Sequence, residues 1–303
     1  MPDLQESLLR VIGEDSDAPV PAAITTVAEA ARQRHGQAIV AVLFYGSCLR
    51  RRGDEGGIVD LYLLADRYER VHRKRLMRTL NALLPPNVYY IEAPFEGRRV
   101  AAKYAIVTLG QFESLVAPST LQPYFWARFA QPTIVLWVRD AEIRSRVQAA
   151  LGQAVATMVT EARGLMANDW TPAELWPRAF VETYRTELRA EPADQAQQLY
   201  RAFAERYNRV TRIVARDATG PLSAADRFRA AGRWRQRRVI GKLLSVLRLA
   251  KASFTFEDGA AYLIWKIRRH SGVQMELTPW QYRHPILASA VLAWRLYRAR
   301  GFR

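Results

Sequence analysis

The stretch QAIVAVLFYGSCLRRRGDEGGIVDLYLLAD, residues 37–66, contains the strongest structural signal in the chain. Two apolar runs, residues 38–45 and 58–65, flank a segment rich in glycine and arginine. Each run is short, β-branched and aromatic and is bounded by turn residues, which is typical of a buried strand rather than a helix. The stretch therefore predicts two strands joined by a tight, basic connection.

The connection begins with Gly46 and Ser47. A glycine at the end of a buried strand allows close backbone approach, and the hydroxyl and N–H groups after it can bind a phosphate. Arg50, Arg51 and Arg52 follow and could screen the charge of such a ligand. A plain β-hairpin with a solvated basic loop would also explain these arginines, so the loop alone leaves both interpretations open.

The second apolar run contains one carboxylate, Asp60. A carboxylate inside a buried strand is costly unless it is paired or binds a metal ion. We therefore predict a partner for Asp60, which is a metal ion in the phosphate-binding interpretation and a nearby N–H group or arginine in the hairpin interpretation. Asp66 shares its face of the strand but lies ~20 Å away, too far to hold the same ion. Other candidate ligands are Asp54, Glu55 and Glu92.

Composition limits the class of protein. The chain has 303 residues and is 50% hydrophobic, which is enough for two domains with ordinary cores. A single cysteine, Cys48, excludes an intrachain disulfide and suits a reducing compartment, and we expect it to be a packed turn residue rather than a nucleophile. The sequence has no typical signal peptide and no apolar stretch of membrane-spanning length, so we expect neither secretion nor a transmembrane helix.

The net charge of +16 implies an acidic partner, which could be nucleic acid, an anionic membrane surface or a phosphorylated substrate. Fifteen Lys and Arg but three acidic residues lie within residues 233–303, so such a partner is expected to contact the C-terminal region. The sequence has no ribonucleoprotein-type aromatic motif, zinc-binding pattern or helix-turn-helix signature. Nucleic acid is therefore not the expected partner.

The order of the predicted elements favours a small mixed sheet covered by helices, because strands and helices do not alternate regularly. After a polar leader we expect helices at 21–34 and 66–84 and, besides the two strands above, strands at 87–92, 99–109 and 132–138. His72 is expected on the surface of the second helix.

From residue 140 onward the strand pattern disappears and apolar residues recur at helical spacing. The helical segments are 142–166, 174–190, 193–215, 224–252, 259–270 and 285–300. We predict an α+β protein with a domain at 1–140 that holds the sheet and a helical, basic domain at 141–303.

Gly-Ser followed about a dozen residues later by an acid within an apolar strand resembles the polymerase-β-like nucleotidyltransferase superfamily. The resemblance implies that Gly46 and Ser47 hold a nucleotide triphosphate and that Asp60 binds Mg²⁺. The superfamily usually has two acids at i and i+2, on one face of the strand, where they share metal ions. Here Tyr62 occupies the second position, so half of the usual metal site is missing.

Further stretches resemble one branch of that superfamily, the mitochondrial-type phosphatidate cytidylyltransferases (the translocator-assembly-and-maintenance proteins) and their bacterial relatives. These are YGS at 45–47, VDLYLLAD at 59–66, His72, NVYY at 87–90, KYAIVT at 103–108 and FWARFAQP at 125–132. That branch also has a single acid at the strand position. The resemblance is looser in the second half, where TYRTELRAE at 183–191 is similar to bacterial members but receives no catalytic role. Cys48 and the arginines at 50–52 depart from the family's loop.

The resemblance implies an enzyme that uses CTP, phosphatidate and Mg²⁺ to make CDP-diacylglycerol and pyrophosphate in phospholipid biosynthesis. A phosphate monoester, with a second pKa of about 6, is already an anion near neutral pH and needs less activation than a hydroxyl. The predicted catalytic residues are Asp60, which is also the metal ligand, Lys103 and Arg128. The predicted nucleotide-binding residues are Tyr45, Gly46, Ser47, Arg50 and Arg51.

A lipid substrate requires contact with a membrane. Residues 285–300 place apolar side chains at helical spacing and end in arginines, and such a helix can lie in the headgroup layer of an anionic membrane. It can equally pack on its own domain with its arginines in water. The candidate membrane residues are Trp280, Trp294, Arg295 and Arg298. On this interpretation the enzyme is cytoplasmic and peripheral on the inner face of the membrane.

Two other functions fit the same composition. The chain could transfer a nucleotide to RNA, to a protein or to a small molecule. It could also be a binding protein on a decayed nucleotidyltransferase core, although the presence of Gly46, Ser47 and Asp60 argues against decay.

Overall fold

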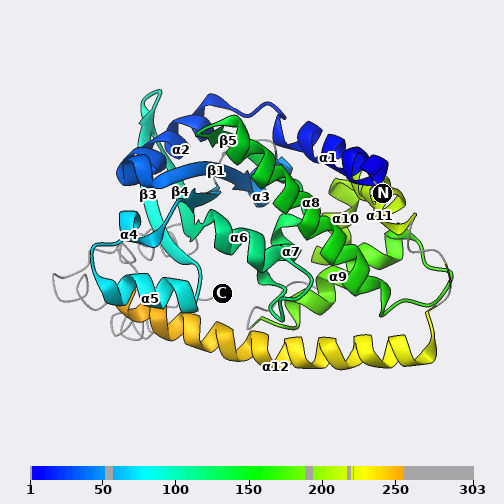
Figure 1. The fold of residues 1–303 in the computed structure, drawn as a ribbon. Helices are drawn as coiled ribbons and strands as arrows, with labels where there is room; N and C mark the ends of the chain where they lie inside the picture. The colour runs from blue at the N-terminus through cyan, green and yellow to red at the C-terminus, as the bar shows by residue number, and fades with distance from the viewer. Residues whose placement is uncertain (1, 52–56, 188–193, 217–219, 221, 256–303) are drawn as a thin grey trace, which may run out of the picture.

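A computed structural model describes residues 2–51, 57–187, 194–216, 220 and 222–255 of the chain (Figure 1). Five strands form one mixed sheet in the order β3-β4-β2-β1-β5, in which β2 and β4 are parallel and the other neighbours antiparallel. The strands are β1 (Ile39–Tyr45), β2 (Val59–Ala65), β3 (Asn87–Phe95), β4 (Arg98–Thr108) and β5 (Ile134–Val138). The predicted α+β fold with a small mixed sheet is confirmed.

Helices surround the sheet. Those before β5 are α1 (Pro2–Ser16), α2 (Ala22–His35), α3 (Ser47–Arg51), α4 (Tyr68–Val71), α5 (Arg75–Leu83), α6 (Leu109–Val116) and α7 (Tyr124–Phe129). Those after it are α8 (Ala141–Arg163), α9 (Pro172–Tyr184), α10 (Gln195–Ala202), α11 (Ala204–Ala215) and α12 (Ala224–Thr255). The predicted helical C-terminal region is therefore confirmed up to Thr255.

Two predicted helices lie beyond this point. The segments 259–270 and 285–300, with the candidate membrane residues Trp280, Trp294, Arg295 and Arg298, lie outside the described residues. Within the described part, no helix combines the length and the apolarity needed to cross a membrane.

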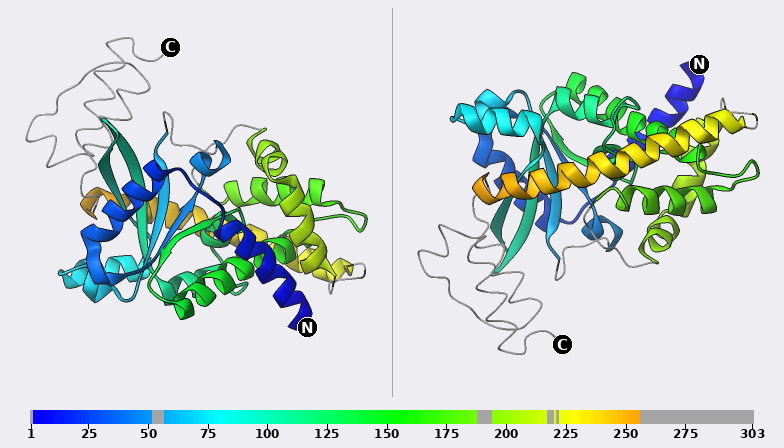
Figure 2. Two further views of the ribbon diagram at one scale, coloured as in Figure 1. Left: turned by 90° about the horizontal axis from the view of Figure 1, so that it is seen from above. Right: turned by 90° about the horizontal axis from the view of Figure 1, so that it is seen from below.

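Both faces of the sheet are covered, which explains why its central strands are almost continuously apolar. On one face, Val42 and Phe44 of β1 share a core cluster with Ile24 and Val27 of α2. On the other face, Leu43 of β1 belongs to a second core cluster, which includes residues of the helices α6 to α9. In Figures 1 and 2, α2 lies above the sheet, while α6 and the long helix α12 lie below it.

The second of these clusters continues across the predicted domain boundary. Tyr62 of β2 belongs to the same set of contacting buried residues as Val155 of α8, Trp176 of α9 and Trp234 of α12. The sheet and the helical region are therefore joined by a continuous core, and the boundary at residue 140 stays a prediction.

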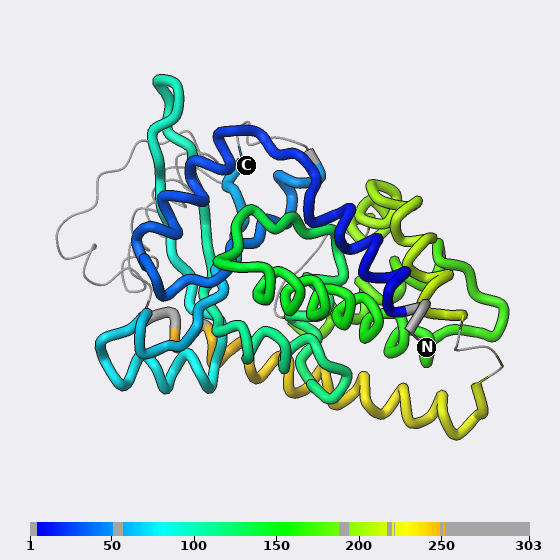
Figure 3. The backbone as a smooth tube through the Cα atoms, turned by 45° about the horizontal axis from the view of Figure 1, so that its top comes forward, coloured from blue at the N-terminus to red at the C-terminus, as the bar shows by residue number. Residues whose placement is uncertain are grey.

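Several segments differ from the sequence-based expectation, among them 193–215, which was predicted as one helix and is two, α10 and α11. The polar leader forms α1, which contacts α8 and α11 (Figure 3). Its Val11 and Ile12 are buried. The single helix predicted at 66–84 is two helices, α4 and α5, with a break after Val71.

His72 lies at that break and is buried, so the prediction of a surface position was wrong. Its Nε2 lies 2.7 Å from the amide nitrogen of Asn81, and burial lowers the pKa of His72 to about 4. Asn81 in turn accepts a hydrogen bond of 2.9 Å from Nζ of Lys251 on α12. The hydrogen-bonded network around His72 thus extends to a residue almost 180 positions away, which local sequence patterns do not reveal.

Candidate active site

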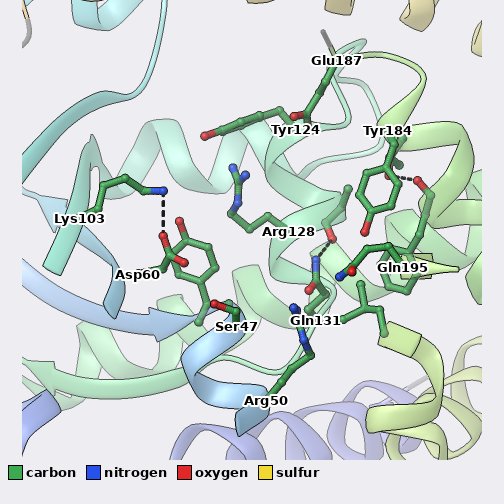
Figure 4. Close-up of a pocket in the computed structure, with 16 residues that line it drawn as sticks. Ser47, Arg50, Asp60, Lys103, Tyr124, Arg128, Gln131, Tyr184, Glu187 and Gln195 are labelled. Carbon is green, nitrogen blue, oxygen red and sulfur yellow. Dashed lines mark hydrogen bonds and ion pairs between the residues drawn. The ribbon is translucent and has the colours of Figure 1, made fainter. Parts of the chain in front are cut away.

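The ends of β1 and β2 meet β4 and the helices α7, α9 and α10 around a pocket of about 190 Å³ (Figure 4). Seven of the eight predicted catalytic and nucleotide-binding residues line this pocket: Tyr45, Gly46, Ser47, Arg50, Asp60, Lys103 and Arg128. The side chain of the eighth, Arg51, lies outside the described part of the structure. The structure therefore brings together residues that are spread over more than 80 positions of the sequence.

The sheet register places Asp60 in this pocket. Asp60 lies opposite Tyr45 of β1 on one side and opposite Lys103 of β4 on the other. Side chains alternate along a strand, so Asp60 points to the same face as Tyr62 and Leu64, which is the face covered by the helical region. A carboxylate at the start of this otherwise apolar strand thus faces the pocket instead of the core.

Lys103 is the partner that a carboxylate in this strand requires. Its Nζ lies 3.0 Å from Oδ1 of Asp60, and both side chains are partly exposed, at 37% for Lys103 and 21% for Asp60. The partner in the described structure is thus a lysine, and not the N–H group or the arginine that the hairpin interpretation names. The ion pair holds a negative and a positive group side by side at the pocket wall, where each can also contact a ligand.

Gly46 is adjacent to this ion pair. Its φ of +90° is a conformation that residues with a side chain rarely adopt. A Cβ atom at this position would also lie 2.8 Å from Oδ2 of Asp60. Both the backbone conformation and the contact with the carboxylate therefore require glycine here.

If the predicted nucleotidyl transfer takes place in this pocket, Gly46→Ala is expected to reduce it far more than Gly97→Ala. Gly97 also has a positive φ, +76°, but a Cβ there would have no atom within 4 Å. Both substitutions add backbone strain of roughly 1–2 kcal/mol, but only Gly46→Ala displaces the Asp60 carboxylate. Urea unfolding would measure the loss of stability that both variants share. A nucleotidyl-transfer assay would measure the additional loss of activity that is expected only in Gly46→Ala. Equal activity of the two variants would contradict this role of Gly46.

Cys48 is buried, and its Sγ donates a hydrogen bond of 3.2 Å to the carbonyl of Ile58. It is therefore a packed residue of the connection between β1 and β2, as predicted. The connection itself begins as the short helix α3, which the sequence did not predict.

Tyr62, at the position of the superfamily's second acid, belongs to the core. Its side chain is fully buried, its ring packs edge-on against Phe125 and Phe129, and its hydroxyl lies 3.5 Å from that of Tyr124. Burial raises the pKa of Tyr62 well above its usual value. The position at which the superfamily that the sequence resembles has its second acid is thus a neutral residue that supports the pocket wall from behind.

Of the other acidic candidates, the two that the structure describes do not supply a second ligand. Glu92 of β3 accepts hydrogen bonds from Tyr90 and Arg99, both of 2.6 Å, and does not line the pocket. Asp66 forms an ion pair of 2.9 Å with Arg70 at the far end of β2. Asp54 and Glu55 lie outside the described residues.

The carboxylate of Asp60 still fits one Mg²⁺ ion that is bound together with a nucleotide. Among the described residues no three His, Cys, Asp or Glu side chains form a group that could hold a metal. However, Mg²⁺ is often bound by one or two carboxylates, with substrate phosphates and water completing its six oxygen ligands. Asp60 alone suits that arrangement, whereas it does not suit a metal site made entirely by the protein.

Arg128 of α7 has an unusual environment. Its guanidinium carbon lies 4.1 Å from the ring centroid of Tyr124 and 5.6 Å from that of Tyr45. Its Nη1 is buried and has no hydrogen-bond partner within the described structure. An unpaired buried donor costs about 1–3 kcal/mol, and more when it is charged. A ligand oxygen in the pocket would remove this cost.

Two guanidinium groups contact the ring of Tyr124. Arg248 of α12 contacts the ring of Tyr124 at 4.7 Å and donates a hydrogen bond of 2.8 Å to the carbonyl of Pro85. Together with Arg128, it fixes the orientation of this ring at the pocket wall. The C-terminal half of α12 therefore takes part in shaping the site.

Several residues of the pocket had no predicted role. Tyr124 and Gln131 come from the region of α7, and the helical region adds Thr183, Tyr184, Glu187, Gln195 and Leu199. The resemblance of residues 183–191 to bacterial cytidylyltransferases could have pointed to the helical side of the pocket, because this stretch supplies three of these residues. Comparisons of the chain with protein-family models and with curated proteins find no match.

Proposed function

We propose that this protein is a Mg²⁺-dependent nucleotidyltransferase that uses CTP and phosphatidate to make CDP-diacylglycerol and pyrophosphate. The observation that supports this proposal best is the convergence of Gly46, Ser47, Asp60, Lys103 and Arg128 on one pocket. These residues belong to the motifs that resemble the cytidylyltransferases, and they come from the turn after β1 and from α3, β2, β4 and α7.

The charges of the pocket suit this reaction. CTP and phosphatidate are both anions, and transfer between them requires the two to be held close together against their repulsion. Arg50, Lys103 and Arg128 line the pocket, whose acidic residues are Asp60 and Glu187. The unpaired Nη1 of Arg128 offers a hydrogen bond to a phosphate oxygen.

The proposed roles follow from these positions. A phosphate oxygen of phosphatidate attacks the α-phosphorus of CTP, the bond from that phosphorus to the oxygen shared with the β-phosphate breaks, and pyrophosphate leaves. The attacking monoester is already an anion near neutral pH, so no protein base has to activate it. Asp60 would hold Mg²⁺, which neutralises phosphate charge when bound; Lys103 orients Asp60, and Arg128 binds the phosphates.

A lipid acceptor also implies a location. We propose that the protein works at the cytoplasmic face of the membrane as a peripheral protein. The high positive charge supports this, because anionic lipids attract Lys and Arg near their surface.

The test is a labelling experiment with the purified full-length protein. CTP, ATP, GTP and UTP, each labelled at the α-phosphate, would be supplied with Mg²⁺ and with vesicles that contain phosphatidate. We expect labelled CDP-diacylglycerol only with CTP and phosphatidate, together with release of pyrophosphate. Label in RNA, in protein or in a small molecule would reject the lipid acceptor, and nucleotide binding without any transfer would indicate a decayed enzyme.

A further inference from the structure

The long helix α12 exposes a row of large apolar side chains. At a rise of 1.5 Å per residue its 32 residues extend ~48 Å, and Figure 2 shows it crossing the underside of the molecule. Five of its apolar residues are between 40% and 82% exposed: Phe228, Val239, Leu243, Val246 and Leu247. At 3.6 residues per turn these five lie on one side of the helix. They form the exposed apolar row of α12.

The opposite side of α12 is firmly packed, so the row is not the result of a detached helix. Trp234 is fully buried and donates a hydrogen bond of 3.1 Å to the carbonyl of Glu161. Arg237 is also buried and donates a hydrogen bond of 2.6 Å to the carboxylate of the same Glu161. The helix therefore has a fixed orientation, with the apolar row facing outward.

Basic residues accompany the apolar row. α12 contains nine Lys and Arg and one acidic residue, Asp226. Its exposed cations are Arg229, Arg233, Arg235 and Lys242. The surface thus combines apolar and positively charged groups along one helix, with almost no negative charge.

The neighbouring helix α5 continues this character. Lys251 of α12 reaches α5 through its hydrogen bond to Asn81, and both helices are visible on the underside in Figure 2. Leu76 and Leu83 of α5 are 68% and 70% exposed. The exposed cations next to them are Arg73, Lys74 and Arg75. We call α5 and the exposed side of α12 together the α5–α12 face.

We propose that the α5–α12 face binds the surface of an anionic lipid bilayer. Large exposed apolar patches usually mark an interaction site. An amphipathic helix with basic residues beside its apolar side lies in the plane of the headgroups, with the apolar side chains among the acyl chains. The excess of Lys and Arg complements anionic lipid, whereas it would make two copies of this face repel each other.

This surface also lies close to the pocket. Arg248, which contacts Tyr124 at 4.7 Å, directly follows Val246 and Leu247 of the apolar row. A bilayer on this face would therefore be separated from the pocket wall by about one helix diameter, ~10 Å. The inference deepens the proposed function, since it would bring a lipid acceptor near the site, but membrane binding can be measured without any enzymatic activity.

The test uses the full-length chain and three polar substitutions together, Val239→Gln, Leu243→Gln and Val246→Gln. Vesicles would contain phosphatidylcholine alone or with 30% phosphatidylglycerol, an anionic lipid that is not the proposed substrate. We expect wild-type protein to cosediment with the anionic vesicles, and less so as salt rises from 0.05 to 0.5 M. The affinity of the triple variant for these vesicles should be lower by on the order of tenfold or more, because the variant loses three apolar groups at the interface.

Two controls make the result specific. The matched variant Val239→Ile/Leu243→Met/Val246→Ile keeps the face apolar and should bind like the wild type. Thermal melts should be the same for all three proteins, because the changed side chains are exposed. Wild-type binding by the triple Gln variant would overturn the proposal and direct attention to residues 279–303. The proposal would also be overturned if the wild-type protein formed a dimer and the triple Gln variant did not, because a second copy of the chain would then cover the face.

Discussion

Asp60→Asn is expected to reduce nucleotidyl transfer by on the order of 10³-fold or more while the protein remains folded. The substitution keeps the size of the side chain and an oxygen that can accept a hydrogen bond from Lys103, whose Nζ lies 3.0 Å from Oδ1. It removes the negative charge that a Mg²⁺ ion needs. Metal-bound charge stabilisation contributes several kcal/mol to such a reaction, and each 1.36 kcal/mol corresponds to a factor of ten in rate.

Asp66→Asn is the matched control for this prediction. Asp66 directly follows β2, the strand that begins with Val59 and Asp60, but its carboxylate forms a surface ion pair of 2.9 Å with Arg70. We expect this variant to transfer nucleotide at the wild-type rate. Single-turnover transfer and a thermal melt of both variants would be measured. An active Asp60→Asn protein, or an equal loss in both variants, would mean that Asp60 is not the metal ligand.

The strands of the sheet could be predicted from the sequence because the pattern that identifies each strand lies within the strand and the turn residues beside it. β1 and β2 are buried on both faces, so their residues form uninterrupted apolar runs that end at turn residues. The contrast between such a run and one internal carboxylate was enough to single out Asp60. Its partner, Lys103, was named as a site residue, but its direct pairing with Asp60 depends on the parallel register of β2 and β4, which no local pattern contains.

The helical side of the site could not be predicted in the same way. Tyr184, Glu187 and Gln195 reach the pocket because α9 packs on α8 and α7 and α10 packs on α9, and the contacts of α9 with α7 and α8 join residues distant in the sequence. An isolated polar residue on a helix has the same local pattern whether it faces water or a pocket. His72 shows the converse error, since a histidine among arginines looked exposed but is buried beside Tyr68 of α4 and Asn81 of α5.

Arg128 provides the second large expected effect, because its environment is costly without a ligand. Its Nη1 is buried and unpaired in the described structure, and its guanidinium plane is held over Tyr124 at 4.1 Å. Arg128→Lys keeps the positive charge but loses both the fork of N–H donors and the stacking on the ring. We expect a loss of on the order of 10²–10³-fold in transfer, as when one stabilising donor is removed from an active site.

The same variant separates binding from a purely structural role. If Arg128 holds the phosphates, Arg128→Lys should leave the melting temperature of the free protein nearly unchanged but reduce its rise on addition of CTP, since that rise follows from ligand affinity. Arg144→Lys is the control, because Arg144 of α8 pairs with the exposed Asp17 at 2.9 Å. A lower melting temperature without nucleotide, together with a normal rise on adding it, would show instead that Arg128 only supports the fold. Because an unpaired buried guanidinium weakens the fold that contains it, we expect the ligand-dependent effect to be the larger one.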